Sequence, residues 1–262
     1  MVKQKFHKSS IKSYFIWAII GSILVLAISP AITALTGKKN TYALILLPLN
    51  LLLWILSGLN MRNIGIRIGK LSSIIWALFY PIAVIGIAGL ITWTTGNIQA
   101  NNIFISNTIK NILILFLVGL IGVFLTEEGF FRGWLWGIIE KSGFKVWIEL
   151  VWTSVIFCLW HYAVTKMVFH LAGIYIPLYL INILFIGFVF GFLRQMSGSL
   201  LAPSIAHALW NALSYTLFGM GEKAGVLNIA SRKIFDPEIG LLGLLLNFFA
   251  VILFWRLAYK KN

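Results

Sequence analysis

Long apolar runs separated by short polar breaks dominate the chain. Eight of these runs predict helices, at 14–35, 41–59, 71–95, 111–139, 146–165, 173–193, 199–219 and 239–258. Their typical length of about 20 residues is what an α-helix needs to cross the ~30 Å hydrocarbon core of a bilayer. The pattern therefore predicts an all-α polytopic membrane protein with about eight transmembrane helices.

The overall composition leads to the same class. Of the 262 residues, 60% are hydrophobic and only 11% are charged, against about 25% charged in soluble domains. No repeat, low-complexity tract or long polar insertion divides the chain. We therefore expect one transmembrane domain over residues 1–262, with a basic cytoplasmic tail at 1–13. The single cysteine, Cys158, excludes an intramolecular disulfide.

The net charge of +14 adds a prediction of orientation. The basic residues fall mainly between the apolar runs, which indicates anionic lipid headgroups rather than nucleic acid as their partner. An even number of spans places both termini on one side, and that side collects thirteen Lys and Arg residues against seven on the other. Because basic loops stay inside the cell, both termini are predicted to be cytoplasmic. The thirteen are Lys3, Lys5, Lys8, Lys12, Arg62, Arg67, Lys70, Lys141, Lys145, Arg194, Arg256, Lys260 and Lys261.

Three ionisable residues interrupt the fourth apolar run. Glu127 and Glu128 are the first acidic residues of the chain, and Arg132 follows them. Each such residue at mid-bilayer costs about 2.5–3.5 kcal/mol, so they need partners or a function. Glu128 and Arg132 are spaced i,i+4 and can pair on one helix face, which leaves Glu127 without a local partner.

Two histidines also lie in apolar runs. His161 follows Phe157 by four residues, and His207 precedes Asn211 by four, so each pair shares a helix face. Glu127 and His161 lie 17 residues on either side of Phe144. If the hairpin turns there, both lie about 25 Å from the turn and can meet. A lone histidine in a span is more often an interhelical hydrogen-bond residue, but shared depth favours a site.

Other polar and aromatic residues in the spans have ordinary structural explanations. Asn182 and Asn247 are expected to form hydrogen bonds between helices. Trp134, Trp136 and Trp147 are expected to form an aromatic belt at the cytoplasmic surface.

The order of these residues resembles a known family. The chain contains Glu127-Glu128-Gly-Phe-Phe-Arg132, then Phe157-Cys-Leu-Trp-His161, then His207-Ala-Leu-Trp-Asn211. Three such motifs on successive helices are similar to those of the CAAX protease and bacteriocin-processing family, also called Abi. Each motif is weak alone, but the ordered set within 111–215 is specific.

The resemblance implies an intramembrane endopeptidase that acts on a membrane-associated peptide or protein, as in peptide maturation or in bacteriocin processing and immunity. By motif position, Glu127 and His161 would activate water, while His207 and Asn211 would stabilise the oxyanion. Glu128 and Arg132 would hold the first motif in place, and Phe157 is expected to pack the site. The abundance of Lys, Ile and Asn is typical of low-GC bacteria, where a prenylated substrate is not expected.

The chemistry of these residue types allows two versions of the reaction. Amide hydrolysis needs a base for water and donors for the developing negative oxygen, and a glutamate, two histidines and an asparagine provide both. We expect catalysis without a cofactor. The alternative is a zinc ion held by Glu127, His161 and His207, although the helix signature His-Glu-x-x-His is absent.

Two other functions fit part of the pattern. A proton- or ion-coupled transporter also places ionisable residues inside spans. Such carriers usually contain inverted repeats and broken helices, and the sequence shows neither. A non-catalytic immunity or scaffold protein would not need the intact motifs. The sequence therefore favours the protease.

Overall fold

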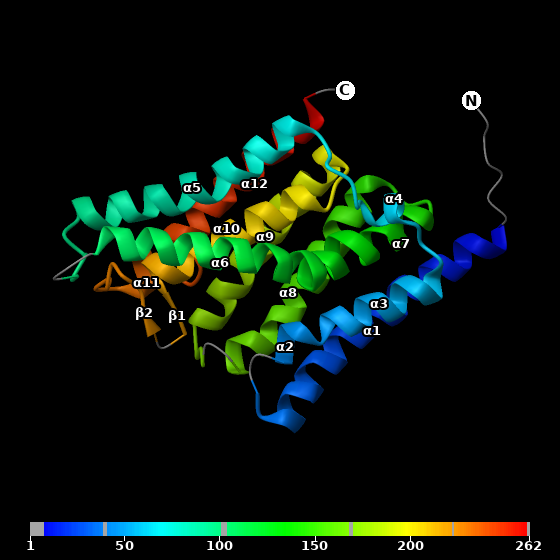
Figure 1. Ribbon diagram of the computed structural model, residues 1–262, viewed down its shortest axis with the longest axis horizontal. Helices are drawn as coiled ribbons and strands as arrows, with labels where there is room; N and C mark the ends of the chain where they lie inside the picture. The colour runs from blue at the N-terminus through cyan, green and yellow to red at the C-terminus, as the bar shows by residue number, and fades with distance from the viewer. Residues whose placement is uncertain (1–7, 39–40, 101–103, 168–169, 222, 261–262) are drawn as a thin grey trace.

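The computed structural model describes residues 8–38, 41–100, 104–167, 170–221 and 223–260, and most of them are helical (Figure 1). This confirms the all-α fold. The elements in chain order are α1 Lys8–Thr36, α2 Thr41–Leu44, α3 Leu46–Ser57, α4 Met61–Ile64, α5 Leu71–Thr94, α6 Ile105–Leu125, the π-helix η1 Gly129–Leu135, α7 Trp136–Lys141, α8 Val146–Met167, α9 Tyr175–Ser197, α10 Leu201–Leu217, β1 Gly219–Met220, β2 Lys223–Ala224, α11 Arg232–Phe235 and α12 Leu241–Tyr259. The two short strands pair antiparallel.

Each of the eight predicted segments is helical, but they differ in length. Six helical stretches of the described chain are long and apolar enough to cross a membrane. The other two predicted spans are shorter: 41–59 contains α2 and the 12-residue α3, and 199–219 contains the 17-residue α10. The structure shows a polytopic membrane protein, and the count of eight crossings stays a prediction.

α10 lies inside the bundle, where it packs against α5, α6 and α9. Most of its residues are buried, including four alanines: Ala202, Ala206, Ala208 and Ala212. Small side chains let helix backbones approach closely in membranes. Because α10 contacts protein more than lipid, it can be shorter and more polar than the outer helices.

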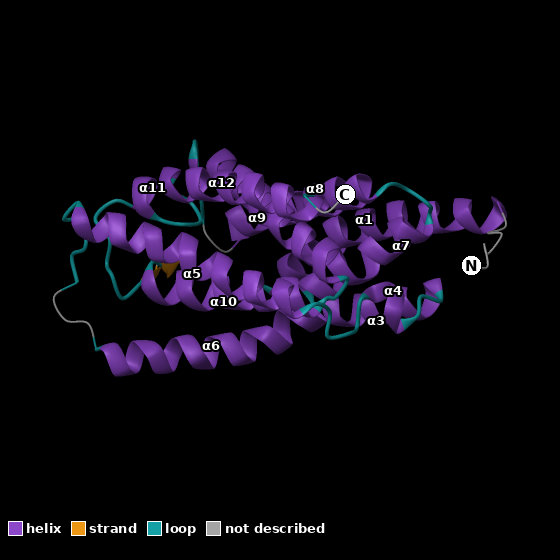
Figure 2. Cartoon of the chain, turned by 90° about the horizontal axis from the view of Figure 1, so that it is seen from above, coloured by secondary structure: helices purple, strands orange, loops and turns teal. Residues whose placement is uncertain are grey.

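The outermost helix is α6, which runs along one side of the bundle (Figure 2). Its outward face consists of exposed apolar residues, among them Leu113, Leu117, Val118 and Ile121. A continuous apolar face of this kind is typical of contact with lipid.

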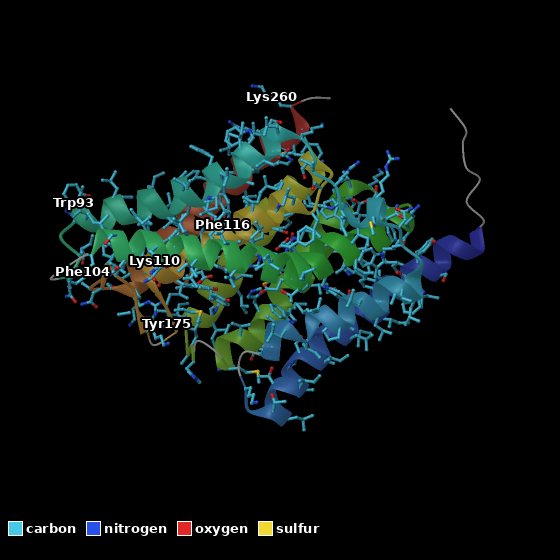
Figure 3. All side chains as sticks on the ribbon, viewed as in Figure 1. Trp93, Phe104, Lys110, Phe116, Tyr175 and Lys260 are labelled. Atoms are coloured by element: carbon cyan, nitrogen blue, oxygen red, sulfur yellow. The ribbon has the colours of Figure 1, made fainter. Side chains whose placement is uncertain are left out.

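The start of α1 and the end of α12 lie on one side of the bundle. α1 begins and α12 ends toward the upper right of Figure 1, whereas the connections after α5 and α10 lie at the left. Figure 3 likewise shows Trp93 and Phe104 at one end of the α5–α12 pair and Lys260 at the other. α1 begins at Lys8 rather than at 14, so part of the predicted 1–13 tail is helical. Residues 1–7, with Lys3, Lys5 and His7, lie outside the described residues.

A buried chain of polar side chains joins three helices. The Tyr80 hydroxyl donates to Asn247 Oδ1 at 2.6 Å, and Asn247 Nδ2 donates to Asn182 Oδ1 at 2.8 Å. These contacts connect α5, α12 and α9. They confirm that Asn182 and Asn247 form hydrogen bonds between helices.

The predicted tryptophan belt is wrong for two of its three members. Trp134 and Trp136 are buried, and Trp147 alone is exposed. Trp134 Nε1 donates to the Leu53 carbonyl at 3.1 Å and to Ser57 Oγ at 3.0 Å. The indole is therefore satisfied inside the protein by α3, so it has no need of the lipid headgroup region.

Candidate active site

The first motif lies at a break in its helix. α6 ends at Leu125, Thr126 leaves the helical conformation, and the chain resumes as the π-helix η1. The carbonyl groups of Leu125 and Thr126 accept hydrogen bonds from Asn50 Nδ2 on α3 at 2.9 and 2.8 Å. A Cβ atom on Gly129 would lie only 2.8 Å from the Phe124 carbonyl oxygen, so this position requires glycine. Short π-helical segments occur often at functional sites.

The break places Glu127 between two histidines. Its Oε2 atom lies 3.8 Å from His161 Nε2 and 3.8 Å from His207 Nε2. This buried oxygen has no hydrogen-bond partner among the described residues. Because 3.8 Å is too long for a direct hydrogen bond, the three groups are spaced to share a water molecule.

The second motif fixes the orientation of His161. Its Nδ1 lies 2.8 Å from the Phe157 carbonyl oxygen, one helical turn earlier. A carbonyl oxygen only accepts hydrogen bonds, so Nδ1 carries the proton. In the neutral ring Nε2 then has a free lone pair, and it is this atom that faces Glu127.

The third motif connects to the first through Glu128. His207 Nδ1 lies 2.9 Å from Glu128 Oε1, and Arg132 Nη1 lies 3.2 Å from the same oxygen. Arg132 Nη2 also donates to the Gly187 carbonyl at 2.9 Å, and its guanidinium carbon lies 4.4 Å from the centre of the Phe157 ring. Glu128 therefore fixes the orientation of the His207 ring through Nδ1, while Arg132 balances the charge of the Glu128 carboxylate.

A small cavity joins these residues. It measures about 40 Å³, enough for about three waters at roughly 10–15 Å³ each. Its walls come from the broken helix and from α8, α9, α10 and the segment before α12. The lining residues are Glu127, Phe157, His161, Ile183, Ile186, Phe190, His207, Trp210, Asn211, Tyr215 and Glu238.

All four residues predicted to be catalytic line this cavity, as does Phe157. Glu128 does not line it but contacts His207, and Arg132 pairs with Glu128. The sequence did not point to Asn50, Gly187 or Glu238. Glu238 could have been noticed because acidic residues are scarce in this sequence. The chain has only seven, and Glu238 directly precedes the last apolar run. Asn50 gave no comparable signal, since single asparagines in apolar runs are common.

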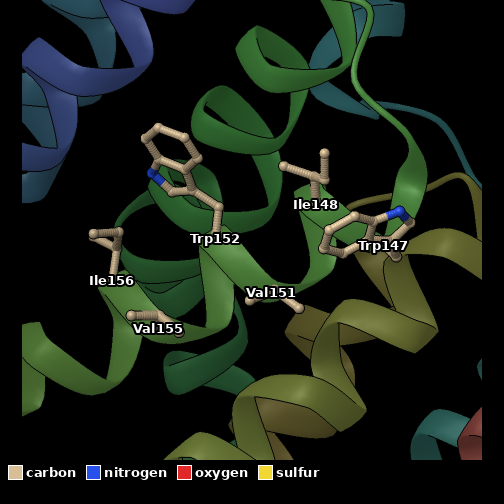
Figure 4. Close-up of a pocket in the computed structure, with 6 residues that line it drawn as sticks. All are labelled: Trp147, Ile148, Val151, Trp152, Val155 and Ile156. Carbon is tan, nitrogen blue, oxygen red and sulfur yellow. The ribbon is translucent and has the colours of Figure 1, made fainter.

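A larger hollow on α8 has a different character. It is lined by Trp147, Ile148, Val151, Trp152, Val155 and Ile156 and contains no ionisable side chain (Figure 4). An apolar surface on a membrane helix suits lipid or an apolar partner. It offers no base or charged donor for hydrolysis.

A zinc ion needs ligand atoms about 2.0–2.2 Å from the metal. Within the described ranges, no group of three or more His, Cys, Asp or Glu side chains has the arrangement of a metal site. The Glu127 oxygen lies 3.8 Å from Nε2 of both His161 and His207, so these three residues would be the ones to hold a zinc ion if one bound. Zinc binding by these residues stays a prediction.

Comparison with known proteins points to one family. Residues 109–213 match the model of the family described as type II CAAX prenyl endopeptidase, Rce1-like. This segment contains the three motifs from Glu127 to Asn211. No curated protein and no solved structure matches the chain.

Proposed function

We propose that this chain, whose residues 109–213 match the family described as type II CAAX prenyl endopeptidase, Rce1-like, is an intramembrane endopeptidase. It hydrolyses a peptide bond with water activated by Glu127 and His161. The observation that carries the proposal is the position of Glu127 Oε2, 3.8 Å from both histidine Nε2 atoms. A carboxylate facing two imidazoles across the width of a water is the arrangement that general-base catalysis needs.

In the first step, a water in the cavity attacks the carbonyl carbon of the substrate. The Nε2 lone pair of His161 orients the water, and Glu127 takes one of its protons as the new carbon–oxygen bond forms. The proton of His161 stays on Nδ1, which donates it in a hydrogen bond to the Phe157 carbonyl oxygen 2.8 Å away, so the ring keeps its Nε2 lone pair directed at the water.

The negative oxygen that forms in this step needs hydrogen-bond donors. Glu128 lies 2.9 Å from His207 Nδ1, and a carboxylate there favours the doubly protonated ring. His207 Nε2 then carries a proton that it can donate to the oxyanion, together with the Asn211 amide one turn further along α10. When the carbon–nitrogen bond breaks, the leaving nitrogen takes up one proton, which balances the proton removed from water.

The substrate we propose is a membrane-associated peptide or protein, in keeping with a site surrounded by transmembrane helices. The cavity of about 40 Å³ is far smaller than the roughly 300–1,000 Å³ of ordinary ligand pockets. A peptide can enter only if the surrounding helices move. The family match and the intact set of reactive groups favour a hydrolase over a transporter or a scaffold.

A comparison of peptide termini tests this function without knowledge of the substrate. Membranes from cells that express the wild type, Glu127→Gln or Glu140→Gln are analysed by mass spectrometry for new C-termini. Glu140 is an exposed carboxylate outside the cavity and serves as the control. We expect the same new termini with the wild type and the control, and none with Glu127→Gln. Equal termini in all three samples would reject the protease.

The same variants test the metal-free mechanism once a cleaved peptide is known. Purified protein is assayed with and without a strong chelator, and zinc is then added back. We expect the chelator to leave the rate unchanged. Inhibition that zinc reverses would assign Glu127, His161 and His207 to metal binding.

A further inference from the structure

Glu238 is a carboxyl group in the cavity that the three motifs do not include. It lies just before α12, outside the segment 109–213 that matches the family, and its residue is only 5% exposed. Its side chain lines the same cavity as Glu127, His161 and His207. A second carboxyl group therefore faces the reaction space from a separate part of the chain.

The backbone around Glu238 is held from two directions. Asn182 Nδ2 donates to the carbonyl groups of Pro237 and Glu238, each at 2.8 Å. Asp236 Oδ1 accepts from the backbone N–H groups of Glu238 at 2.8 Å and Ile239 at 3.1 Å. This loop is therefore rigid at the residue that enters the cavity.

Both anchors are themselves supported. The Asn182 amide is fixed by Asn247, which accepts from the Tyr80 hydroxyl. Asp236 forms an ion pair with Arg232 at 2.7 Å. Groups held by packing and by a further layer of hydrogen bonds keep the precise positions that catalysis requires. The buried polar chain between α5, α9 and α12 thus positions Glu238 as well as joining the helices.

The proton affinity of this carboxyl group suits exchange near neutral pH. Burial and the negative charge of Asp236 raise the pKa of Glu238 to about 8, against the opposing effects of the nearby Trp210 indole, Arg232 and His207. Groups whose pKa lies near the working pH are the most effective general acids.

The proposed reaction leaves one requirement without a residue. Glu127 and His161 act on the water, and His207 and Asn211 act on the carbonyl oxygen, but the leaving nitrogen still needs a proton. We propose that Glu238 is a catalytic general acid, which contacts the nitrogen of the scissile bond and donates its proton as the carbon–nitrogen bond breaks. This inference rests on the proposed endopeptidase function.

The step balances without any further reactant. Glu238 gives one proton to the nitrogen and becomes a carboxylate, while Glu127 holds the proton taken from water. As the amine and the carboxylic acid leave, the proton passes from Glu127 to Glu238 through cavity water. Both residues then return to their starting state.

A pair of matched substrates tests the proposal. One is a cleavable peptide, and the other has the same sequence up to the scissile carbonyl group but ends in a phenyl ester. A phenolate can leave without taking up a proton, whereas the amine of a peptide must be protonated as it leaves. Glu238→Gln keeps the size and hydrogen bonding of the side chain but has no acidic proton. We expect this variant to lose about 10²–10⁴-fold in kcat/KM on the peptide and to keep the rate on the ester.

The ester reaction also shows that the variant is folded. Glu127→Gln should lose activity on both substrates, because both need activated water, and Glu140→Gln should lose neither. Wild-type activity of Glu238→Gln on the peptide, or an equal loss on peptide and ester, would overturn the role of Glu238 and leave the endopeptidase intact. Full activity of Glu127→Gln on both substrates would instead reject the proposed function.

Discussion

Nδ1 of His207 lies 2.9 Å from Oε1 of Glu128, the same oxygen that Arg132 Nη1 approaches at 3.2 Å. Glu128 is thus shared between a structural cation and a histidine of the site. This explains why two adjacent glutamates are present, because Glu127 faces the cavity while Glu128 fixes the ring opposite it. The pair of acids separates the chemical role from the supporting role.

Arg132 should be essential for stability. Its side chain and that of Glu128 are both fully buried, so Arg132→Ala removes one partner of a buried ion pair and leaves the Glu128 carboxylate with His207 alone. Breaking such a pair typically destabilises a protein by about 3–5 kcal/mol. We expect a lower yield and a lower melting temperature in detergent.

The double variant Glu128→Gln with Arg132→Gln is the control, because it removes both charges and should be more stable than Arg132→Ala. Normal thermal stability of Arg132→Ala would show that the pair does not support the fold.

Asn50 should be required for the helix break that presents Glu127. Its amide is the donor to the Leu125 and Thr126 carbonyl groups, and the Thr126 carbonyl also accepts from the Phe130 N–H at 2.9 Å. Asn50→Leu therefore removes two hydrogen bonds and leaves the Leu125 carbonyl without this donor. A buried acceptor left unpaired costs about 1–3 kcal/mol. We expect a lower melting temperature and loss of activity.

Ser57, another buried polar residue, is on the same helix, at its end. Ser57 contacts the Trp134 indole of η1 rather than the carbonyl groups at the break, and in Ser57→Ala that indole keeps the Leu53 carbonyl as an acceptor. Ser57→Ala therefore serves as the control and should keep more of the activity. Equal activity of Asn50→Leu and wild type would contradict the role given to Asn50.

Glu238 should make the folded protein less stable as the pH rises. Burial and Asp236 raise the pKa of Glu238 from 4.5 to about 8 in the folded state, and burial also raises the pKa of Asp236. Between these two pKa values of Glu238, the folded protein binds more protons than the unfolded chain, so stability falls across that range. Arg232 and His207 oppose the shift but do not reverse it.

Melting temperatures at pH 5 and pH 8 test this. The wild type should lose more stability between the two pH values than Glu238→Gln, by about a few °C for a chain of this size. An identical loss in the two proteins would place the titration elsewhere.

Both termini should be cytoplasmic. The basis is the excess of Lys and Arg on the side of the termini, and α1 begins and α12 ends toward one side (Figure 1). A phosphatase that works only outside the cytoplasm should be inactive when fused after Asn262, and active when inserted in the connection between α5 and α6. The reverse result would invert the orientation.

The sequence predicted the helices and the core of the site because both depend on the lengths of apolar runs and on residue spacing along helices. Apolar runs must be about as long as the bilayer is thick, and equal distances from a hairpin bring Glu127 and His161 together. The same reasoning placed Glu128 and Arg132 on one face, and the structure confirms that they pair.

The remaining features depend on tertiary contacts that spacing does not encode. The π-helix at Gly129–Leu135 requires the Asn50 amide from a distant helix, and Trp134 is buried because Leu53 and Ser57 satisfy its indole. Glu238 enters the cavity only because Asn182 and Asp236 hold its loop. In each case a polar group on another segment determines the local structure.

The central claim is that Glu127 and His161 act as one unit on water. The most direct measurement is kcat/KM of purified wild type, Glu127→Gln, His161→Ala and the double variant on one cleavable peptide. We predict that each single variant folds and loses about 10²–10⁴-fold, and that the double variant is scarcely slower than either, because residues that act together do not lose activity additively. Losses that multiply in the double variant, or full activity of Glu127→Gln, would contradict the account.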